Sequence, residues 1–325
     1  HIGWAATGQR VRQQVPGGRR TWGLNILPRM SEPAAPSTSP HRRALDETAL
    51  RSLLRRQTGV PWLHGEVARR MAQRLSIVKQ PPSQVLDWWA QRGGGGAVLR
   101  QACPRASIRA VEPARASPSA PSPWWTRLWR PSPAWVEEAV PAGEAQLLWS
   151  NMMLHWAVDP TQVLLRWHRA LAVEGFVMFS CFGPDTLREL RTLFADQGHG
   201  PIGVDFVDMH DLGDMLVHAG FADPVMDMET LTLTWDDAHR MLSELRELGR
   251  NLHPQRFAGL RTPRWRDQWL RRLPRREDGR WALSFEIVYG HAFKPVPRVR
   301  VASQASVSLD DMRTMVRRTP PPGRG

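Results

Sequence analysis

The sequence is poor in the residues and runs that build disulfide-linked, metal-bound or membrane-spanning proteins. Its two cysteines, Cys103 and Cys181, are too few for a disulfide framework and are typical of a reducing compartment. No stretch approaches the roughly 18 apolar residues that a membrane-spanning helix needs. The first residues lack the apolar core of a signal peptide, and the histidines show no metal-site spacing. These absences favour a cytoplasmic protein with no membrane anchor.

Lysine is also nearly absent. Only Lys79 and Lys294 are lysines among the 44 basic residues, and the formal net charge is +13. The preference for Arg, Ala, Pro and Gly is typical of GC-rich coding, so part of this charge is expected from composition alone. A functional origin would be an acidic partner, either a nucleic acid or an acidic carrier protein. No nucleic-acid-binding motif is apparent, which makes nucleic acid the less favoured partner. No nucleophile elbow or phosphate loop is apparent either.

The 325 residues are enough for one large globular domain. Residues 1–43 are rich in Pro, Ser and Arg without a periodic apolar face, and they are expected to form a disordered tail. Within this tail, Met30 reads like a natural start, so residues 1–29 need not be native. The domain is expected at 44–310 and is followed by a frayed tail at 311–325.

The clearest pattern lies in the middle of the chain. The apolar runs Leu147–Trp149 and Phe176–Phe179 predict strands, and Thr161–Leu171 between them has helical apolar spacing. Strand, helix and strand in this order predict a parallel crossover in an α/β sheet. Ligands of such sheets lie beyond the carboxyl ends of the strands, where Ser150-Asn151 and Ser180–Asp185 stand.

The same rules predict further elements on both sides of this unit. Helices are expected at 44–54, 62–75, 97–102, 208–219 and 236–248, and strands at 84–87, 107–112, 224–235, 281–289 and 299–307. Residues 113–140 hold five prolines between 118 and 133, mixed with tryptophans, and they are predicted to be irregular.

Four segments carry a resemblance to known families. Leu147–Pro160 resembles the fourth strand and following loop of class I S-adenosylmethionine-dependent methyltransferases. FGPDTLRELR (Phe182–Arg191) and DMHDLGDMLVHAGFADPVMD (Asp208–Asp227) resemble the malonyl-acyl-carrier-protein O-methyltransferases of biotin synthesis, and the similarity recurs at Phe285–Pro295. The resemblance implies a Rossmann-like, mostly parallel sheet with an antiparallel final strand. It also implies S-adenosylmethionine as the cofactor and an acidic acyl carrier protein bearing a malonyl group as the partner.

The family has the motif D-x-G-x-G-x-G after the first strand, because glycines let the backbone approach the cofactor. Aligned without a gap, Trp89 and Gln91 stand at two glycine positions and Gly93 at the third. Aligned with a gap, Gly93–Gly96 would form the loop. The spacing to the next strand is family-like without the gap. Upstream, RRQTGVPWLH (Arg55–His64) replaces the aromatic-aspartate pair with which the family covers the cofactor.

The cofactor candidates stand at predicted strand ends or in the loops that follow them. Glu112 ends the second strand, where an acidic residue accepts hydrogen bonds from the ribose hydroxyls in adenosyl-binding folds. Either Glu137 or Glu138 would meet the adenine amino group. The cofactor-binding candidates are Asp87, Gly93, Gly94, Glu112, Asn151 and His155.

Methyl transfer to a carboxylate needs little acid–base help, because the carboxylate is already ionised at pH 7. The site must align the reacting atoms, exclude water and hold the negative charge, a role that suits arginine. The substrate-binding candidates are Arg188, Tyr289 and His291, and no catalytic residue is assigned.

Three functions are left open. The leading one is methylation of the free carboxylate of malonyl-acyl carrier protein. The second is a methyltransferase fold that binds an acyl carrier or protein without catalysis, which Trp89 and Gln91 suggest. The third is methylation of another small acid or of a nucleic acid. The ten arginines between Arg246 and Arg276 predict either a solvated face or a docking surface for the acidic carrier.

Overall fold

The computed structural model describes residues 42–56, 59–76, 78, 80–113, 134–196 and 200–297. The predicted tails and edge strand beyond these limits (1–41 and 298–325) lie outside the described residues, as does most of the proline-rich segment (114–133). Arg42 and Arg43, at the end of the predicted tail, are described.

In the described part of the chain, seven strands form one sheet in the order β3-β2-β1-β4-β5-β7-β6. They are β1 (Gln84–Trp88), β2 (Ser107–Glu112), β3 (Trp135–Val136), β4 (Ala145–Ser150), β5 (Leu171–Phe182), β6 (Ala222–Trp235) and β7 (Trp281–Phe293). The strands β1 to β5 pair in parallel, and β7 runs antiparallel to its neighbours β5 and β6. This Rossmann-like sheet confirms the predicted fold class.

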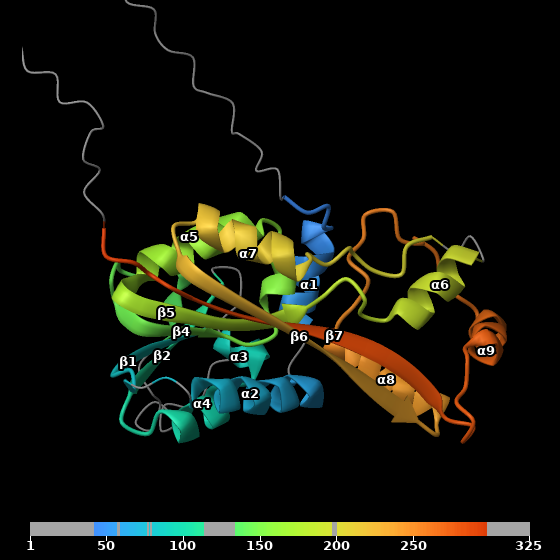
Figure 1. The fold of residues 1–325 in the computed structure, drawn as a ribbon. Helices are drawn as coiled ribbons and strands as arrows, with labels where there is room; N and C mark the ends of the chain where they lie inside the picture. Colours follow the sequence, from blue (N-terminus) through green and yellow to red (C-terminus); the bar gives the residue numbers. More distant parts are fainter. Residues whose placement is uncertain are drawn as a thin grey trace, which may run out of the picture. The chain divides into compact units, whose positions relative to one another are not determined.

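Helices cover both faces of the sheet (Figure 1). On one face lie α2 (Trp62–Leu75) and α4 (Gly96–Ala102), and on the other lie α5 (Pro160–Ala170) and α7 (Met209–His218). The helices α5 and α7 each begin at an aspartate cap and carry an apolar face. In α5, for example, the Asp159 carboxylate accepts a hydrogen bond from the Gln162 N–H, and Pro160 takes the first turn.

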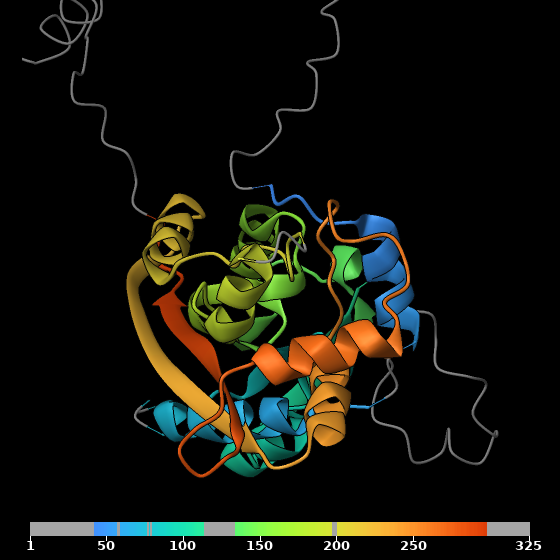
Figure 2. The same ribbon diagram turned by 90° about the vertical axis from the view of Figure 1, so that its right-hand side faces the viewer.

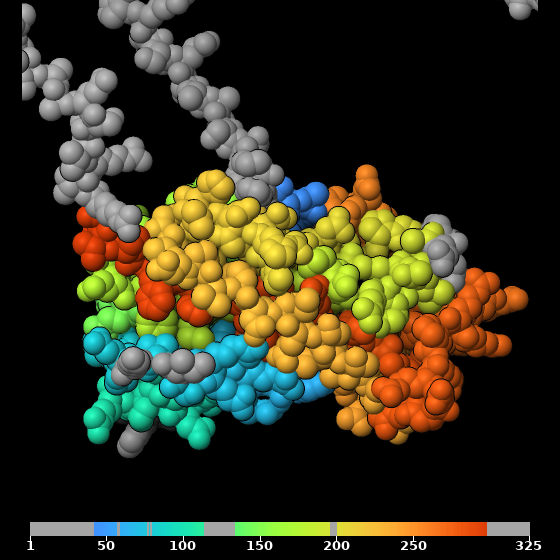
Figure 3. Space-filling view, in the orientation of Figure 1, coloured from blue at the N-terminus to red at the C-terminus, as the bar shows by residue number. Residues whose placement is uncertain are grey.

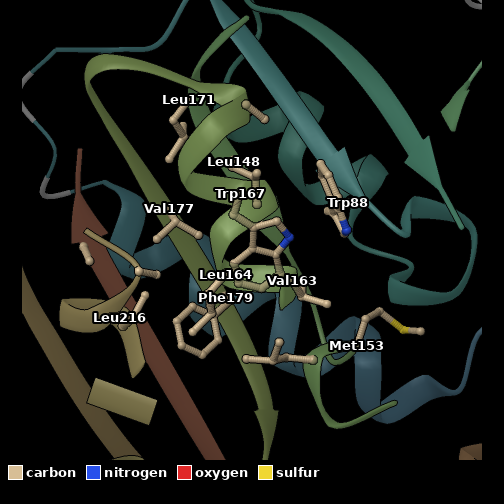
Figure 4. Close-up of a cluster of buried hydrophobic side chains, with 14 of the residues drawn as sticks. Trp88, Leu148, Met153, Val163, Leu164, Trp167, Leu171, Val177, Phe179 and Leu216 are labelled. Carbon is tan, nitrogen blue, oxygen red and sulfur yellow. The ribbon is translucent and has the colours of Figure 1, made fainter. Parts of the chain in front are cut away.

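The core beneath α5 is built from large side chains of consecutive elements (Figure 4). Trp167 packs edge-on against Trp88 of β1, with ring centroids 6.4 Å apart, and lies 5.6 Å from the Phe179 ring of β5. Leu148 and Leu164 fill the space around them, and both are fully buried. Truncating a buried tryptophan such as Trp167 to alanine would cost about 3–5 kcal/mol, so this core fixes β1 relative to β5.

On the other face, α2 lies along β6 (Figure 3). Arg70 pairs with Glu229 and Arg74 with Asp227, each at 2.6 Å. Part-exposed pairs of this kind contribute about 1 kcal/mol or less each. Their geometry nevertheless fixes the register of the early helix on the late strand.

A further group of helices surrounds the end of the β6–β7 strand pair at which Trp235 pairs with Trp281 (Figure 2). It comprises α6 (Arg188–Asp196), α8 (Ala238–Leu248) and α9 (Pro263–Arg272). Phe194 of α6 contacts both Trp265 and Trp269 of α9 edge-on, at 6.0 and 5.8 Å. The first helix, α1 (Glu47–Arg56), packs its leucines against Val204 and Leu252 in the loops beside this group.

Candidate functional site

Three parallel strands end at one edge of the sheet. The register places Asp87 of β1 beside Ala110 of β2 and Trp149 of β4. Glu112 ends β2, and Asn151 directly follows β4. The structure therefore brings Asp87, Glu112 and Asn151 to the edge where ligands of open α/β sheets bind.

Two positions in the turn after β1 have local geometry that favours glycine. Trp89 has a φ of 58°, in the left-handed region that costs most residues about 1–2 kcal/mol. The short helix α3 (Ala90–Gly93) follows. A Cβ added to Gly93 would lie 2.8 Å from the Asn151 carbonyl oxygen, so no larger residue fits there. Trp89 and Gly93 occupy two of the three glycine positions in the ungapped alignment with the family motif.

The segment above this turn packs directly onto it. Gly94 has a φ of 68°, and a Cβ added to it would lie 2.1 Å from Val60 Cγ1. Val60 belongs to the stretch that replaces the family's aromatic cover. The loop is therefore covered by an aliphatic side chain in this protein.

Asp87 and Glu112 form a buried acidic pair. Asp87 is only 3% exposed, and its Oδ1 has no hydrogen-bond partner among the described residues. Burial raises the pKa of Asp87 to about 7; the Glu112 charge adds to this shift and Arg100 opposes it. Burial likewise raises the pKa of Glu112 to about 7, although the Gln91 N–H donates to its Oε1 at 2.9 Å. Because both carboxyls titrate near neutral pH, a cationic ligand would favour their ionised forms.

Glu137, in the turn after β3, is engaged by three donors. The Trp88 Nε1–H donates to its Oε1 at 3.1 Å, and the Trp89 Nε1–H donates to the same oxygen. The Arg166 guanidinium donates to Oε2 at 2.9 Å. Burial raises the pKa of Glu137, while these donors lower it. Of the two glutamates considered for adenine recognition, Glu137 is thus buried and occupied, and Glu138 is exposed.

Asn151 acts as a clamp between three parts of the chain. Its Nδ2–H₂ donates to the His64 carbonyl oxygen at 2.8 Å and to the Gly93 carbonyl oxygen at 2.6 Å. Its Oδ1 accepts a hydrogen bond from the Ser180 hydroxyl at 2.9 Å. His64 adds a second link, because its Nδ1–H donates to the Arg92 carbonyl oxygen at 2.9 Å. The amide of Asn151 therefore holds α2, the turn after β1 and β5 together.

His155 lies in the short 3₁₀ turn after β4 and is only 5% exposed. Its Nδ1 accepts a long hydrogen bond from the Phe182 N–H at 3.4 Å, and its Nε2 has no partner among the described residues. Burial and the nearby His64 and Arg43 charges hold the pKa of His155 well below its usual value, so the imidazole is neutral. The ring forms part of the wall of a cavity.

This cavity has a volume of about 760 Å³, and we call it the arginine cavity. Its walls come from α6, α8, α9, the loops beside them and the start of β7. Aromatic and aliphatic side chains make up most of the lining, and none of the described residues in it is an Asp or Glu. Six arginines do contribute: Arg191, Arg246, Arg250, Arg256, Arg261 and Arg266.

The three substrate-binding candidates from the sequence are not brought together. Arg188 is exposed and lies 3.8 Å from Glu189. The Tyr289 hydroxyl donates to Glu229 at 2.6 Å on the α2 side of the sheet. His291, two residues further along β7, packs edge-on against Phe293. None of the three lines the arginine cavity.

Sequence reasoning missed two residues that position the site. Arg43, assigned to the tail, donates from its guanidinium to the carbonyl oxygens of His155 and Asp205, each at 2.5 Å. No periodicity marked it. His64 could have been found, because it shares the i, i+3, i+7 spacing of Val67 and Met71 on the buried face of α2.

Two kinds of site are absent from the described ranges. No group of three or more His, Cys, Asp or Glu residues lies in a metal-binding arrangement there. No helix of this part of the chain combines the length and apolarity needed to cross a membrane.

Comparison with solved structures gives distant likenesses. The YcgJ protein of Bacillus subtilis is 12% identical with a TM-score of 0.44, covering 72% of this chain and 100% of its own. A putative methyltransferase of Bacillus halodurans is 14% identical with a TM-score of 0.42, covering 70% of this chain and 99% of its own.

Comparison with curated proteins gives much closer relatives, although no model of a known protein family matches the chain. A malonyl-[acyl-carrier protein] O-methyltransferase of Gallionella capsiferriformans is 39% identical over 251 residues, which cover 73% of this chain and 86% of the relative. One from Laribacter hongkongensis is 38% identical over 272 residues, covering 78% and 88%. With this identity over most of both lengths, the chain belongs to the malonyl-[acyl-carrier protein] O-methyltransferase family.

Proposed function

We propose that the protein transfers a methyl group from S-adenosylmethionine to the free carboxylate of a malonyl group carried by acyl carrier protein. In biotin synthesis this methylation begins the pimeloyl branch. The observation that carries the proposal is the 39% identity to a relative of that name over 86% of the relative's length. The malonyl carrier as substrate follows from the names of the relatives.

The edge formed by β1, β2 and β4 has the chemistry to hold this cofactor. Asp87 Oδ1 is a buried acceptor without a partner among the described residues, which suits a cationic ligand group. Glu112, at the end of β2, is the residue that would accept hydrogen bonds from the ribose. Gly93 lets the turn after β1 pack closely against Asn151 at this edge. Both oxygens of Glu137 already accept hydrogen bonds, two at Oε1 and one at Oε2, so the adenine amino group would have to share Oε2 with Arg166.

The bound cofactor would supply an electrophilic methyl group on a sulfonium. The chain's own residues have three tasks: to orient the carboxylate, to exclude water from it and to hold its charge. No proton has to be removed, because a carboxylate is ionised at neutral pH. The buried and neutral His155 is therefore suited to donating a hydrogen bond and not to acting as a base.

The non-catalytic alternative rests on Trp89 at a glycine position. The names of the relatives do not favour it, and a single assay distinguishes the two functions. Purified protein is incubated with S-adenosylmethionine and malonyl-acyl carrier protein, and the carrier is analysed by mass spectrometry. The gain of one methyl group on the malonyl carrier and not on the acetyl carrier is expected. Carrier binding without any methyl gain would contradict the proposal and favour the alternative.

A further inference from the structure

The arginine cavity adjoins a second, smaller cavity. The second cavity has a volume of about 340 Å³ and lies between the end of α1, the segment Gly59–Pro61 and α8. Val60, in its wall, is the residue that packs on Gly94 of the turn after β1. The second cavity therefore borders the segment that covers the proposed cofactor loop. Arg246 and Arg250 line both cavities.

Four of the six cavity arginines already have partners. Arg191 donates to the Val204 carbonyl oxygen and Arg256 to Asp46. Arg261 lies over two aromatic rings and Arg266 pairs with Asp267. Arg246 and Arg250 differ, because neither has a hydrogen bond, ion pair or ring contact to another described residue. Both side chains are exposed and line both cavities, and we call this pair the rim arginines.

The end of α8 is held in place by a close contact. A Cβ added to Gly249, between the two rim arginines and next to Arg250, would lie 2.4 Å from Cη2 of Trp156. Trp156 belongs to the same short turn as His155, directly after β4. The backbone between Arg246 and Arg250 therefore lies close to the loop that follows a central strand.

The lining of the arginine cavity also includes His155, whose imidazole carries a hydrogen-bond donor. In the tautomer in which His155 Nδ1 accepts from the Phe182 N–H, Nε2 carries the proton. That Nε2 has no acceptor among the described residues and belongs to a side chain in the cavity wall. Leaving a buried donor unsatisfied costs about 1–3 kcal/mol, and because Nε2 is fully buried behind the cavity surface, a ligand acceptor would reach it only after a shift of the wall side chains.

These features together fit one kind of ligand. Two arginine side chains without a partner among the described residues match a carboxylate, which guanidinium groups bind in a bidentate manner. The described lining of the arginine cavity itself is mostly apolar and carries no Asp or Glu, which matches a flexible acyl chain, and a volume of about 760 Å³ is in the usual range for such sites. We propose that the arginine cavity binds an acyl thioester with a free terminal carboxylate, which Arg246 and Arg250 hold where the two cavities meet. The identification of the acyl group as malonyl rests on the proposed function.

The test measures binding without any methyl donor. Malonyl-pantetheine and acetyl-pantetheine, which differ only in the carboxylate, are titrated into the full chain by calorimetry. The wild-type protein is expected to prefer the malonyl ligand. Arg246→Gln and Arg250→Gln should each weaken malonyl binding about tenfold, and the double variant should lose the preference while acetyl binding is unchanged.

Arg240→Gln is the matched control. Arg240 lies on the same helix but pairs with Glu244 and lines neither cavity, so the malonyl preference should persist. A double variant that keeps the preference would overturn the inference, as would an Arg240→Gln protein that loses it. The proposed function fails independently: malonyl selectivity without methyl transfer would contradict the enzyme assignment and leave this site in place.

Discussion

At the residue scale, the most informative side chain is Trp89. Its backbone takes a left-handed conformation that favours glycine, and its indole N–H donates to the buried Glu137. Non-glycine residues in the left-handed region persist only where surrounding contacts hold them, and such positions gather at functional sites. Glu137 provides that hold, since it also engages Trp88 and Arg166.

Glu137→Ala should therefore destabilise the protein. Two buried indole donors would lose their acceptor, at a cost of about 2–4 kcal/mol in the free energy of unfolding. Urea denaturation followed by tryptophan fluorescence measures this change. The neighbouring exposed residue supplies the control, because Glu138→Ala should change stability by less than about 0.5 kcal/mol. Equal effects of the two substitutions would contradict the role given to Glu137.

Asp87 should make the unliganded protein less stable as the pH rises. Its folded-state pKa is raised from 3.8 to about 7, so between these values the folded state binds a proton that the unfolded state has lost. Stability then falls with rising pH across this window, by up to about 1.4 kcal/mol per pH unit for one group.

The check is urea unfolding between pH 5 and 8 for the wild type and Asp87→Asn. The variant carries no titrating group at this position, so its stability should depend less on pH. Glu112 beside it remains and keeps part of the slope. An unchanged slope in the variant would mean that Asp87 is ionised in the folded protein throughout.

At the element scale, the sequence predicted most of the sheet and its crossover helices. Helix 62–75 and strand 107–112 have the predicted limits, because their apolar spacing and stop signals are both clear. Helix α9 was missed, since only its two tryptophans and Leu270 stand out from charged residues, and its burial depends on Phe194 of α6. Local periodicity cannot reveal a contact between segments about 70 residues apart.

The site was predictable only where strands end. Asp87, Glu112 and Asn151 follow from strand order, so their shared edge could be expected. The sequence could not distinguish the rim arginines from the eight other arginines of the same basic segment. Whether an arginine side chain finds a partner among the described residues depends on how distant segments pack. Arg188, Tyr289 and His291 remain predictions from the resemblance alone.

The N-terminal boundary of the domain can be tested to within two residues. A chain that starts at Arg42 should keep the thermal stability of the full chain. A chain that starts at Ala44 lacks Arg43 and its hydrogen bonds to the His155 and Asp205 carbonyl oxygens. Its free energy of unfolding should fall by about 1–3 kcal/mol. Equal melting of both shortened chains would show that Arg43 contributes nothing.

At the scale of the whole molecule, some of the positive charge is concentrated near α9. The net charge of +13 includes exposed arginines on and beside α9, among them Arg264, Arg271 and Arg272. They lie on the element that also closes one wall of the arginine cavity. An acidic carrier delivering a thioester there would meet positive charge first.

Reversing two of these charges should weaken carrier binding. Arg271→Glu with Arg272→Glu is expected to lower the affinity for malonyl-acyl carrier protein at low salt, and the loss should fade at high salt as screening increases. Arg105→Glu with Arg169→Glu, both exposed on other helices or loops, makes the same change in net charge. If both pairs weaken binding equally, the effect is one of overall charge and not of α9.

The strand order has a consequence for how the protein is made. β7 lies between β5 and β6, although it is synthesised after both. While the ribosome is still translating residues 236–280, β6 has no partner strand and the edge of β5 is open. Unpaired edges of this kind invite pairing with other chains. The pairing of β5, β7 and β6 is complete only once Phe293 has left the exit tunnel, so the newly made chain depends on β7 to protect the two strands made before it.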